Sequence, residues 1–205
     1  MSKSKLLEKY KLNNNVEIKN HIVITPITIA QSTTDGSFND EEKEYLENRA
    51  TNIGIFVFGA TEVSQEGVDI PCRPRALSEK DLPSLSKRAN LIKSQGAKAV
   101  IQLDHRGYYG NIEYSGLSPV APSEEFANED LKKKNMYSEK NKVHELTNDE
   151  ILKLIEKYGI ATELCMKAGL KELKSMQQIL IFYNNFFHHI LISVLMIGEV
   201  LMKKE

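Results

Sequence analysis

Three short runs of apolar residues predict the strands of this chain. They cover residues 20–26, 54–59 and 99–103, and they are rich in valine, isoleucine and phenylalanine. Each run is too short for a helix and is bounded by glycine, proline or polar residues, which is typical of a strand. Because the second run is apolar throughout rather than alternating, we expect strands buried on both faces, as in a parallel sheet.

A helix is predicted behind each of these strands. Apolar residues at helical spacing indicate helices over residues 39–52, 78–95 and 147–169. Asn39 is expected to cap the first helix, and a capping box opens the last one at Thr147. Repeated strand–helix units predict the α/β class. A barrel is favoured over a doubly wound sheet because no glycine-rich dinucleotide motif follows the first strand.

Composition and charge narrow the classes of function. The 205 residues carry a net charge of −1, with both signs interspersed, which argues against a nucleic-acid partner. Cys72 and Cys165 lie far apart and have no cysteine or histidine at metal-ligand spacing. We therefore expect neither a disulfide framework nor a metal site. The N-terminus has no apolar signal segment, so a cytoplasmic location is expected.

Polar side chains at the end of the third strand are the first candidates for chemistry. Gln102 interrupts the apolar run, and His105 follows just past its end. In α/β folds, ligands bind beyond the carboxyl ends of parallel strands. A glutamine there can donate and accept hydrogen bonds at once, which suits a flat heterocycle with carbonyls and ring nitrogens. The alternative is that loop backbone satisfies both side chains.

Four sequence motifs, in colinear order, resemble those of the old yellow enzyme family of flavin oxidoreductases. The similarity extends over residues 6–169. The motifs are KNHIVITPIT at residues 19–28, VFGATEVSQEG at 57–67, QLDHRG at 102–107 and SPVAPS at 118–123. The segment ELT at residues 145–147 is similar to the start of the family's next helix. At family spacing, the set is far more specific than any one member.

The resemblance implies a (β/α)8 TIM barrel that binds FMN at the carboxyl ends of its strands. Residues 1–169 would form the N-terminal portion of this FMN-binding domain, an incomplete barrel. The implied reaction is hydride transfer from NADH or NADPH to FMN, and then to a small-molecule substrate, an activated alkene. Thr28 would lie near the reactive flavin nitrogen, and His105 would lie on the substrate side. The implied cofactor-binding residues are Thr25, Pro26, Thr28, Ala60 and Gln102.

Two positions depart from the family pattern. Tyr108 stands where the family motif ends in arginine, and Ala30 stands where some members have a tyrosine. The family's next strand carries a histidine–asparagine pair that binds the substrate, and no such strand is recognisable in this sequence. We therefore assign no catalytic residue.

Residues 170–205 form a hydrophobic tail that does not continue the pattern. We interpret the tail as translated one nucleotide out of register. In the shifted frame, Met196-Ile197 forces aspartate and Met202-Lys203 forces glutamate, in agreement with the family's segment after its fourth strand. Comparing both frames of the coding DNA tests this interpretation. Two alternatives stay open: a native packing helix, and a membrane anchor that two polar pairs near its centre make costly.

The incomplete barrel and the out-of-register interpretation of the tail together predict a truncated, inactive form of the enzyme. Three strands cannot close a barrel, so we expect the third strand to leave an unpaired edge and the chain not to turn over NADH or NADPH. The alternatives are a non-catalytic fragment or binding module and, less favoured, a tail-anchored membrane protein. Association into a homo-oligomer remains open.

Overall fold

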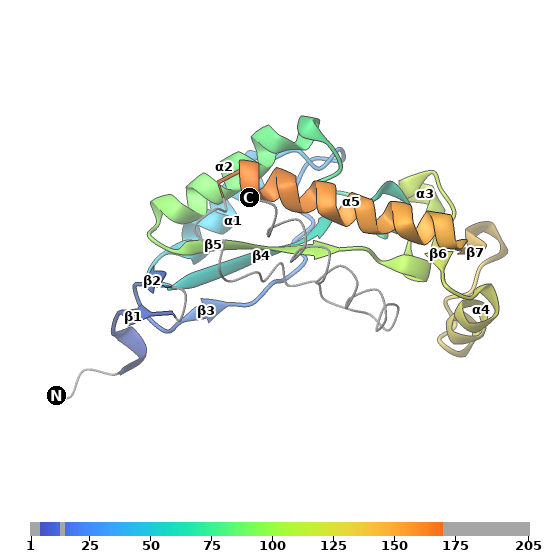
Figure 1. Cartoon of the computed structure of the whole chain (residues 1–205), viewed down its shortest axis with the longest axis horizontal. Helices are drawn as coiled ribbons and strands as arrows, with labels where there is room; N and C mark the ends of the chain where they lie inside the picture. The colour runs from blue at the N-terminus through green and yellow to red at the C-terminus, as the bar shows by residue number, and fades with distance from the viewer. Residues whose placement is uncertain (1–4, 13–14, 170–205) are drawn as a thin grey trace.

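A parallel sheet of three strands lies at the centre of the molecule, in the order β3-β4-β5 (Figure 1). The computed structural model describes residues 5–12 and 15–169. The strands are β3 (Val23–Ile24), β4 (Ile55–Glu62) and β5 (Lys98–Asp104), and both pairings are parallel. The three predicted strands and the α/β class are confirmed.

Three helices cover one face of this sheet (Figure 1). They are α1 (Asp40–Ala50), α2 (Leu82–Ser94) and α5 (Asn148–Lys167). Their apolar side chains pack against the side chains of β4 and β5 that face the helices, and together they form the main hydrophobic core. The core includes Leu46, Phe56, Phe58, Leu85, Ile92, Ile101, Leu103, Leu154 and Leu164.

The helix starts follow the predicted capping chemistry. The Asn39 Oδ1 atom accepts a hydrogen bond from the Glu42 N–H at 2.9 Å. Thr147 and Glu150 form the predicted capping box, with the Thr147 N–H donating to Glu150 Oε2 at 2.8 Å. These bonds satisfy backbone donors that a helix start otherwise leaves unpaired.

The opposite face of the sheet presents the alternate residues of the strands. On β4, Ile55 and Val57 lie on this face, together with Val100 on β5. Because side chains alternate along a strand, Gln102 is directed to the same face as Val100. A small hairpin of β1 (Tyr10–Lys11) and β2 (Glu17–Ile18) packs Ile18 against these residues.

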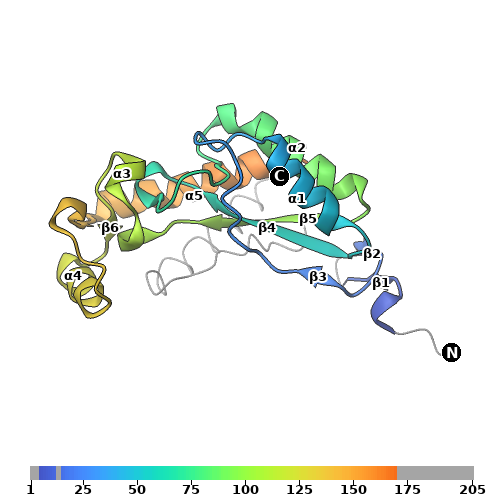
Figure 2. The same cartoon turned by 180° about the vertical axis from the view of Figure 1, so that it is seen from behind.

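Residues 106–145 contain Pro119, Pro122 and a run of three lysines, and their sequence predicts a long loop between the third strand and the last helix. In the structure they form a small lobe at the carboxyl end of the sheet (Figure 2). The lobe is ordered because Tyr108, Leu131 and Val143 contribute to a hydrophobic cluster of its own. Its elements are η4 (Gly107–Tyr109), α3 (Ile112–Ser115), β6 (Val120–Ala121), α4 (Glu124–Lys133), η5 (Glu139–Asn141) and β7 (His144–Glu145). Three further single turns are η1 (Lys5–Leu7), η2 (Gln65–Gly67) and η3 (Glu79–Asp81).

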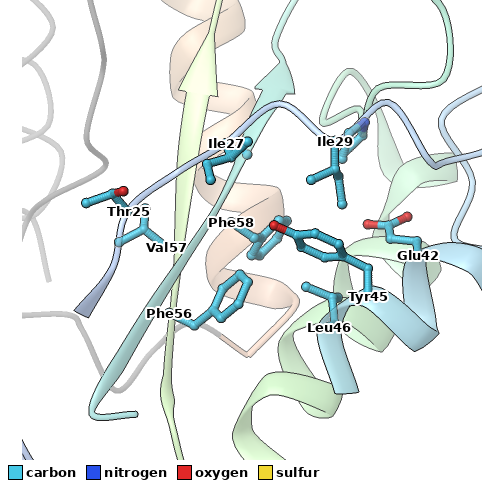
Figure 3. Close-up of a pocket in the computed structure, with 11 residues that line it drawn as sticks. Thr25, Ile27, Ile29, Glu42, Tyr45, Leu46, Phe56, Val57 and Phe58 are labelled. Carbon is cyan, nitrogen blue, oxygen red and sulfur yellow. The ribbon is translucent and has the colours of Figure 1, made fainter. Parts of the chain in front are cut away.

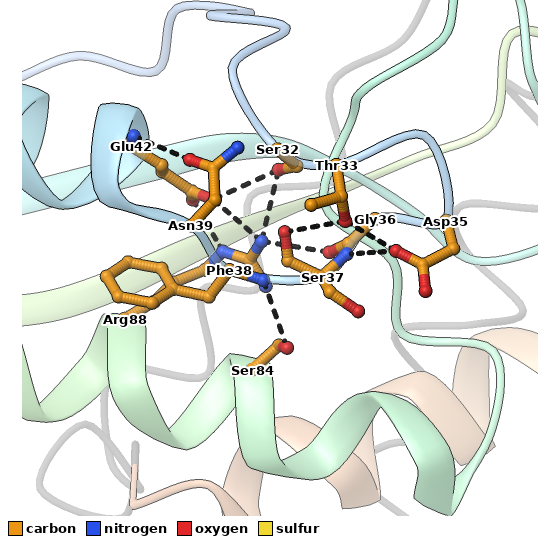
Figure 4. Close-up of polar contacts among 10 residues, drawn as sticks. All are labelled: Ser32, Thr33, Asp35, Gly36, Ser37, Phe38, Asn39, Glu42, Ser84 and Arg88. Carbon is orange, nitrogen blue, oxygen red and sulfur yellow. Dashed lines mark hydrogen bonds and ion pairs between the residues drawn. The ribbon is translucent and has the colours of Figure 1, made fainter.

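A buried ion pair joins α1 to α2 (Figure 4). The Arg88 Nε atom lies 2.5 Å from Glu42 Oε1, and Arg88 Nη2 donates to Glu42 Oε2 at 2.8 Å. The same Nη2 donates to the Gly36 carbonyl at 2.9 Å and to Ser32 Oγ at 3.1 Å. Arg88 is 0% exposed and Glu42 is 1% exposed. The pair therefore holds both helices and the loop that precedes α1 in one arrangement.

The predictions made for residues 170–205 lie outside the described residues. This applies to the out-of-register interpretation, to the packing helix and to the membrane anchor. Among the helices that the structure describes, none combines the length and the apolar character needed to cross a membrane.

Candidate functional site at the carboxyl edge of the sheet

The pairing of β4 with β5 is interrupted at the residues that the sequence singled out. Phe58 pairs with Ile101, and the next pair is Thr61 with Leu103. Two residues of β4 therefore oppose the single residue Gln102 of β5, which is the count of a β-bulge. These two residues are Gly59 and Ala60. A bulge removes backbone groups from the ladder between the two strands.

Gly59 brings the two strands unusually close at this point. A Cβ atom added to Gly59 would lie 2.7 Å from Gln102 Cβ and 3.0 Å from the Gln102 carbonyl oxygen. The backbone φ of Gly59 is +153°, a value that L side chains rarely adopt. Only glycine fits this position, and Gln102 is thereby fixed against the bulge.

The segment that follows β3 lies on the other side of the bulge. Ile27 forms an isolated antiparallel bridge with Gly59. The strand-end segments of β3, β4 and β5 therefore form one row, with Thr28 next to Ile27 at one end and Gln102 at the other. Thr25 and Thr28 are exposed, whereas Ala60 and Gln102 are buried at 5% and 8% exposure. The structure thus brings all five predicted cofactor residues to one edge of the sheet.

A buried cluster of charges lies two residues beyond this row. Arg73 Nη1 lies 2.6 Å from Glu62 Oε1 and 2.5 Å from Asp69 Oδ1. Its Nη2 atom lies 2.5 Å from Asp104 Oδ2. We call these four residues, Glu62, Asp69, Arg73 and Asp104, the arginine cluster. Asp69 also pairs with Arg106, whose Nε atom lies 2.8 Å from Asp69 Oδ2.

Glu62 is the most deeply buried carboxyl of this cluster. Burial raises its pKa well above the usual range, and repulsion from Asp104 adds to this effect. The attraction of Arg73 opposes both and does not cancel them. Glu62 therefore retains a proton at pH values where an exposed glutamate has lost it.

Glu62→Gln is expected to remove a pH dependence of stability. A raised pKa in the folded state stabilises the protein fully below the unfolded pKa, and the contribution is lost as pH rises through the folded value. Relative to the variant, the native protein should lose up to about 1.4 kcal/mol of unfolding free energy per pH unit above pH ~4.5. Urea denaturation at several pH values measures the difference. Parallel curves for the two proteins would contradict it, and exposed Glu44→Gln is the matched control.

His105 lies beside this edge with its side chain buried. The side chain is 0% exposed, and its Nδ1 atom accepts a hydrogen bond from the Gly107 N–H at 3.0 Å. A Cβ atom added to Gly67 would lie 2.8 Å from the ring, so the η2 turn packs directly on the imidazole. The Nε2 atom is 3.9 Å from Glu66 Oε1. His105 thus joins the η2 turn to the end of β5 and does not line the row of cofactor residues.

Glu66 in turn binds the last helix. Lys157 on α5 lies 2.7 Å from Glu66 Oε1. Burial would raise the pKa of Glu66, but interactions with His105 and Lys157 outweigh it and hold the pKa well below the usual range. Glu66 is therefore ionised, and it ties the η2 turn to α5.

A pocket between β4, α1 and the segment after β3 adjoins this row (Figure 3). Its lining includes Tyr45, Leu46 and Phe58, and the last two belong to the core between the sheet and the helices. Of the predicted cofactor residues, Thr25 lines it, together with the bridge partners Ile27 and Gly59. Gln102 is not among the residues that line this pocket.

Sequence reasoning missed the arginine cluster. One signal was present, because Glu62 and Asp104 follow closely on the predicted strands 54–59 and 99–103, at their carboxyl ends. Carboxylates at such positions meet at one edge and need a cation between them. Arg73 lies in an irregular segment, and no periodicity pointed to it.

Comparisons with known proteins place the chain in one family. The model of the NADH:flavin oxidoreductase / NADH oxidase family matches residues 5–178. The chain is 31% identical over 169 residues to the probable NADH-dependent flavin oxidoreductase of Bacillus subtilis, covering 80% of this chain and 42% of that protein. It is 30% identical over 168 residues to the NADPH dehydrogenase of Clostridium acetobutylicum, covering 80% and 45%.

Solved structures give the fold. The old yellow enzyme from Pichia sp. matches with a TM-score of 0.69 at 22% identity, over 82% of this chain and 45% of that one. The old yellow enzyme homologue from Zymomonas mobilis matches with a TM-score of 0.67 at 25% identity, over 81% and 46%. The chain thus spans less than half the length of these relatives, and the predicted fold, part of an old yellow enzyme TIM barrel, is confirmed.

Proposed function

The chain belongs to the NADH:flavin oxidoreductase / NADH oxidase family, and on this premise we propose that the row at its sheet edge binds FMN. The observation that carries the proposal is the bulge at Gly59 and Ala60, which lies opposite the buried amide of Gln102. It combines backbone groups released from the ladder with a side chain that both donates and accepts hydrogen bonds.

Each residue of the row has a proposed task. Gln102 hydrogen-bonds the polar edge of the flavin ring system, and the Ala60 backbone contacts the ring. Thr25 and Pro26 line the ring from the segment after β3. The Thr28 hydroxyl donates a hydrogen bond near the reactive nitrogen, where it tunes the potential of the cofactor. When bound, FMN supplies hydride transfer from NADH or NADPH to an activated alkene.

The fit of this row to FMN rests on its chemistry. A flavin ring carries alternating carbonyls and ring nitrogens, and a primary amide can pair with both kinds of group. Gly59 lets the backbone of β4 approach the root of the Gln102 side chain closely, and Gln102 is 8% exposed, so the space around this side chain is restricted. Pre-positioned polar groups of this kind reduce the entropy that binding costs.

We propose that His105 acts on the substrate side of the site indirectly, by supporting a turn. Its ring is buried under the η2 turn and holds Gly107 through the Nδ1 bond. We propose that it orients the backbone that follows β5, from which the substrate side of the site begins. In this role the imidazole needs no direct contact with substrate.

We further propose that these 205 residues do not turn over NADH or NADPH on their own. Among the described residues the central parallel sheet has three strands, and three strands do not close a barrel. A second candidate function follows from the same observation, namely a flavin-binding module without catalysis. Steady-state oxidation of NADH by the purified chain with FMN added would contradict the proposal and exclude this candidate.

The replacement Gln102→Leu tests the FMN proposal. It removes the amide while keeping a similar volume, and the loss of hydrogen bonds worth about 1.5 kcal/mol should weaken FMN binding about tenfold. Titration of FMN by fluorescence and the visible flavin spectrum give the dissociation constant and the band shift. Gln95→Leu, at the C-terminal end of α2 and before β5 begins at Lys98, is the matched control and should bind like the native chain. Equal affinity of Gln102→Leu and the control would refute the proposal.

A further inference from the structure

The arginine cluster stands in a fixed relation to the row of proposed flavin contacts. Glu62 follows Ala60 by two residues on β4, and Asp104 follows Gln102 by two residues on β5. Residues two apart on a strand lie on the same face. Glu62 and Asp104 are also register partners, and they form the last pair of the β4–β5 ladder. The cluster therefore closes the ladder directly beyond the bulge.

Without a cation, this last pair would separate the strand ends. Once Glu62 is ionised, two carboxylates stand directly opposite each other on neighbouring strands and repel, and burial strengthens the repulsion. Arg73 offsets it, because its Nη1 atom forms an ion pair with Glu62 Oε1 at 2.6 Å and its Nη2 atom donates a hydrogen bond to Asp104 Oδ2 at 2.5 Å. One planar guanidinium thus spans the two strands, a geometry that a lysine ammonium cannot reproduce.

Arg73 is itself held from both sides. Asp69 Oδ1 lies 2.5 Å from its Nη1 atom, and the Arg73 side chain is 2% exposed. The backbone that follows Arg73 is hydrogen-bonded to the end of β4. The Glu62 N–H donates to the Pro74 carbonyl at 2.9 Å, and the Ala76 N–H donates to the Glu62 carbonyl at 2.8 Å. The guanidinium therefore has a fixed position relative to both strand ends.

We propose that Arg73 is a positioning residue for the flavin-binding row: by bridging Glu62 and Asp104 it sets the register of the bulge and the orientation of the Gln102 amide. The inference rests on the proposed FMN function for the ligand. Its structural part, the control of the bulge by Arg73, does not depend on that function.

Arg73→Lys is the variant that tests this proposal. It keeps the positive charge and removes the planar guanidinium, so the cluster retains a cation while the bridge between the strands is lost. We expect FMN binding to weaken about tenfold and the flavin band shift to decrease. In amide hydrogen exchange, residues 59–63 and 102–105 should exchange at least tenfold faster, whereas residues 55–58 should be unchanged. Arg75→Lys is the matched control, since this arginine contacts the exposed Thr34 carbonyl from the same segment.

A milder variant covers the case in which Arg73→Lys does not fold. Asp104→Asn keeps an oxygen acceptor for Arg73 Nη2 and removes one charge, and we expect an effect of about threefold on the same two measurements. Unchanged exchange and affinity in both folded variants would overturn the proposal. A uniform increase of exchange along the whole of β4 and β5 would also overturn it, because Arg73 would then act on global stability alone.

The two measurements separate the failure of this proposal from the failure of the proposed function. If the native chain does not bind FMN, the proposed function fails, and hydrogen exchange still decides the role of Arg73. A local increase at the bulge then supports the positioning role, and its absence overturns that role. If the native chain binds FMN and Gln102→Leu weakens binding while Arg73→Lys does not, the function stands and the Arg73 proposal fails.

Discussion

Arg88→Met is expected to lower the free energy of unfolding by about 3–5 kcal/mol, because it leaves the buried carboxylate of Glu42 without its cation. Glu42 is 1% exposed, and both of its carboxylate oxygens bind Arg88. The Gly36 carbonyl and the Ser32 hydroxyl lose the same partner. Urea denaturation followed by circular dichroism measures the loss as a lower midpoint at an unchanged slope.

Two controls identify the unpaired charge as the cause. The double variant Glu42→Met/Arg88→Met removes both charges and should recover most of the loss, because apolar residues of similar volume replace buried ion pairs well. Arg49→Met removes an exposed arginine that stacks on Tyr45 and should change stability by less than about 1 kcal/mol. A double variant as unstable as Arg88→Met would show that packing, rather than charge, explains the effect.

Gly59→Ala is expected to destabilise the protein by about 2–4 kcal/mol, through backbone strain and overpacking together. The new methyl group would stand 2.7 Å from Gln102 Cβ, an atom at the root of its side chain that cannot move without the strand. Because the displaced residue is Gln102, FMN affinity should fall by at least tenfold. Urea denaturation and FMN titration measure the two effects.

Gly159→Ala is the matched control for this substitution. Gly159 lies inside α5, and no atom lies within 4 Å of an added Cβ. Alanine there should stabilise the protein by about 0.5–1 kcal/mol, since glycine is a poor helix former. The same chemical change is therefore expected to have opposite signs at the two glycines. A mild effect at Gly59 would show that β5 can move away from β4 at little cost.

The strands and the main helices could be predicted because their signals are local. Apolar runs of strand length gave β4 and β5, and the capping box at Thr147 marked the start of α5. Gln102 was identified for a similar reason, since a polar residue inside an apolar run is visible without any tertiary information. Its position at the end of a parallel strand then followed from the predicted class.

The remaining features depend on contacts that sequence spacing does not reveal. The lobe at residues 106–145 was expected to be a loop because its elements are short, and its order comes from a cluster that gathers residues as distant as Tyr108 and Val143. In the sequence, nothing distinguishes Gly59 from any other strand residue. Only the register of β4 against β5 shows that it lies in a bulge. Arg73 acts over 31 positions on Asp104, a pairing without a periodic signature.

The lobe also bears on how the molecule opens. Its hydrophobic cluster shares no residue with the main core between the sheet and the helices. Proteins open in cooperative units, and a segment with a core of its own can come apart while the rest stays folded. Within the described residues we therefore expect the lobe to open as a unit of its own, before the core of the sheet and helices. Such opening would expose the carboxyl edge of the sheet while β4 and β5 remain paired, and amide hydrogen exchange that is faster over residues 106–145 than over β4 and β5 would show it.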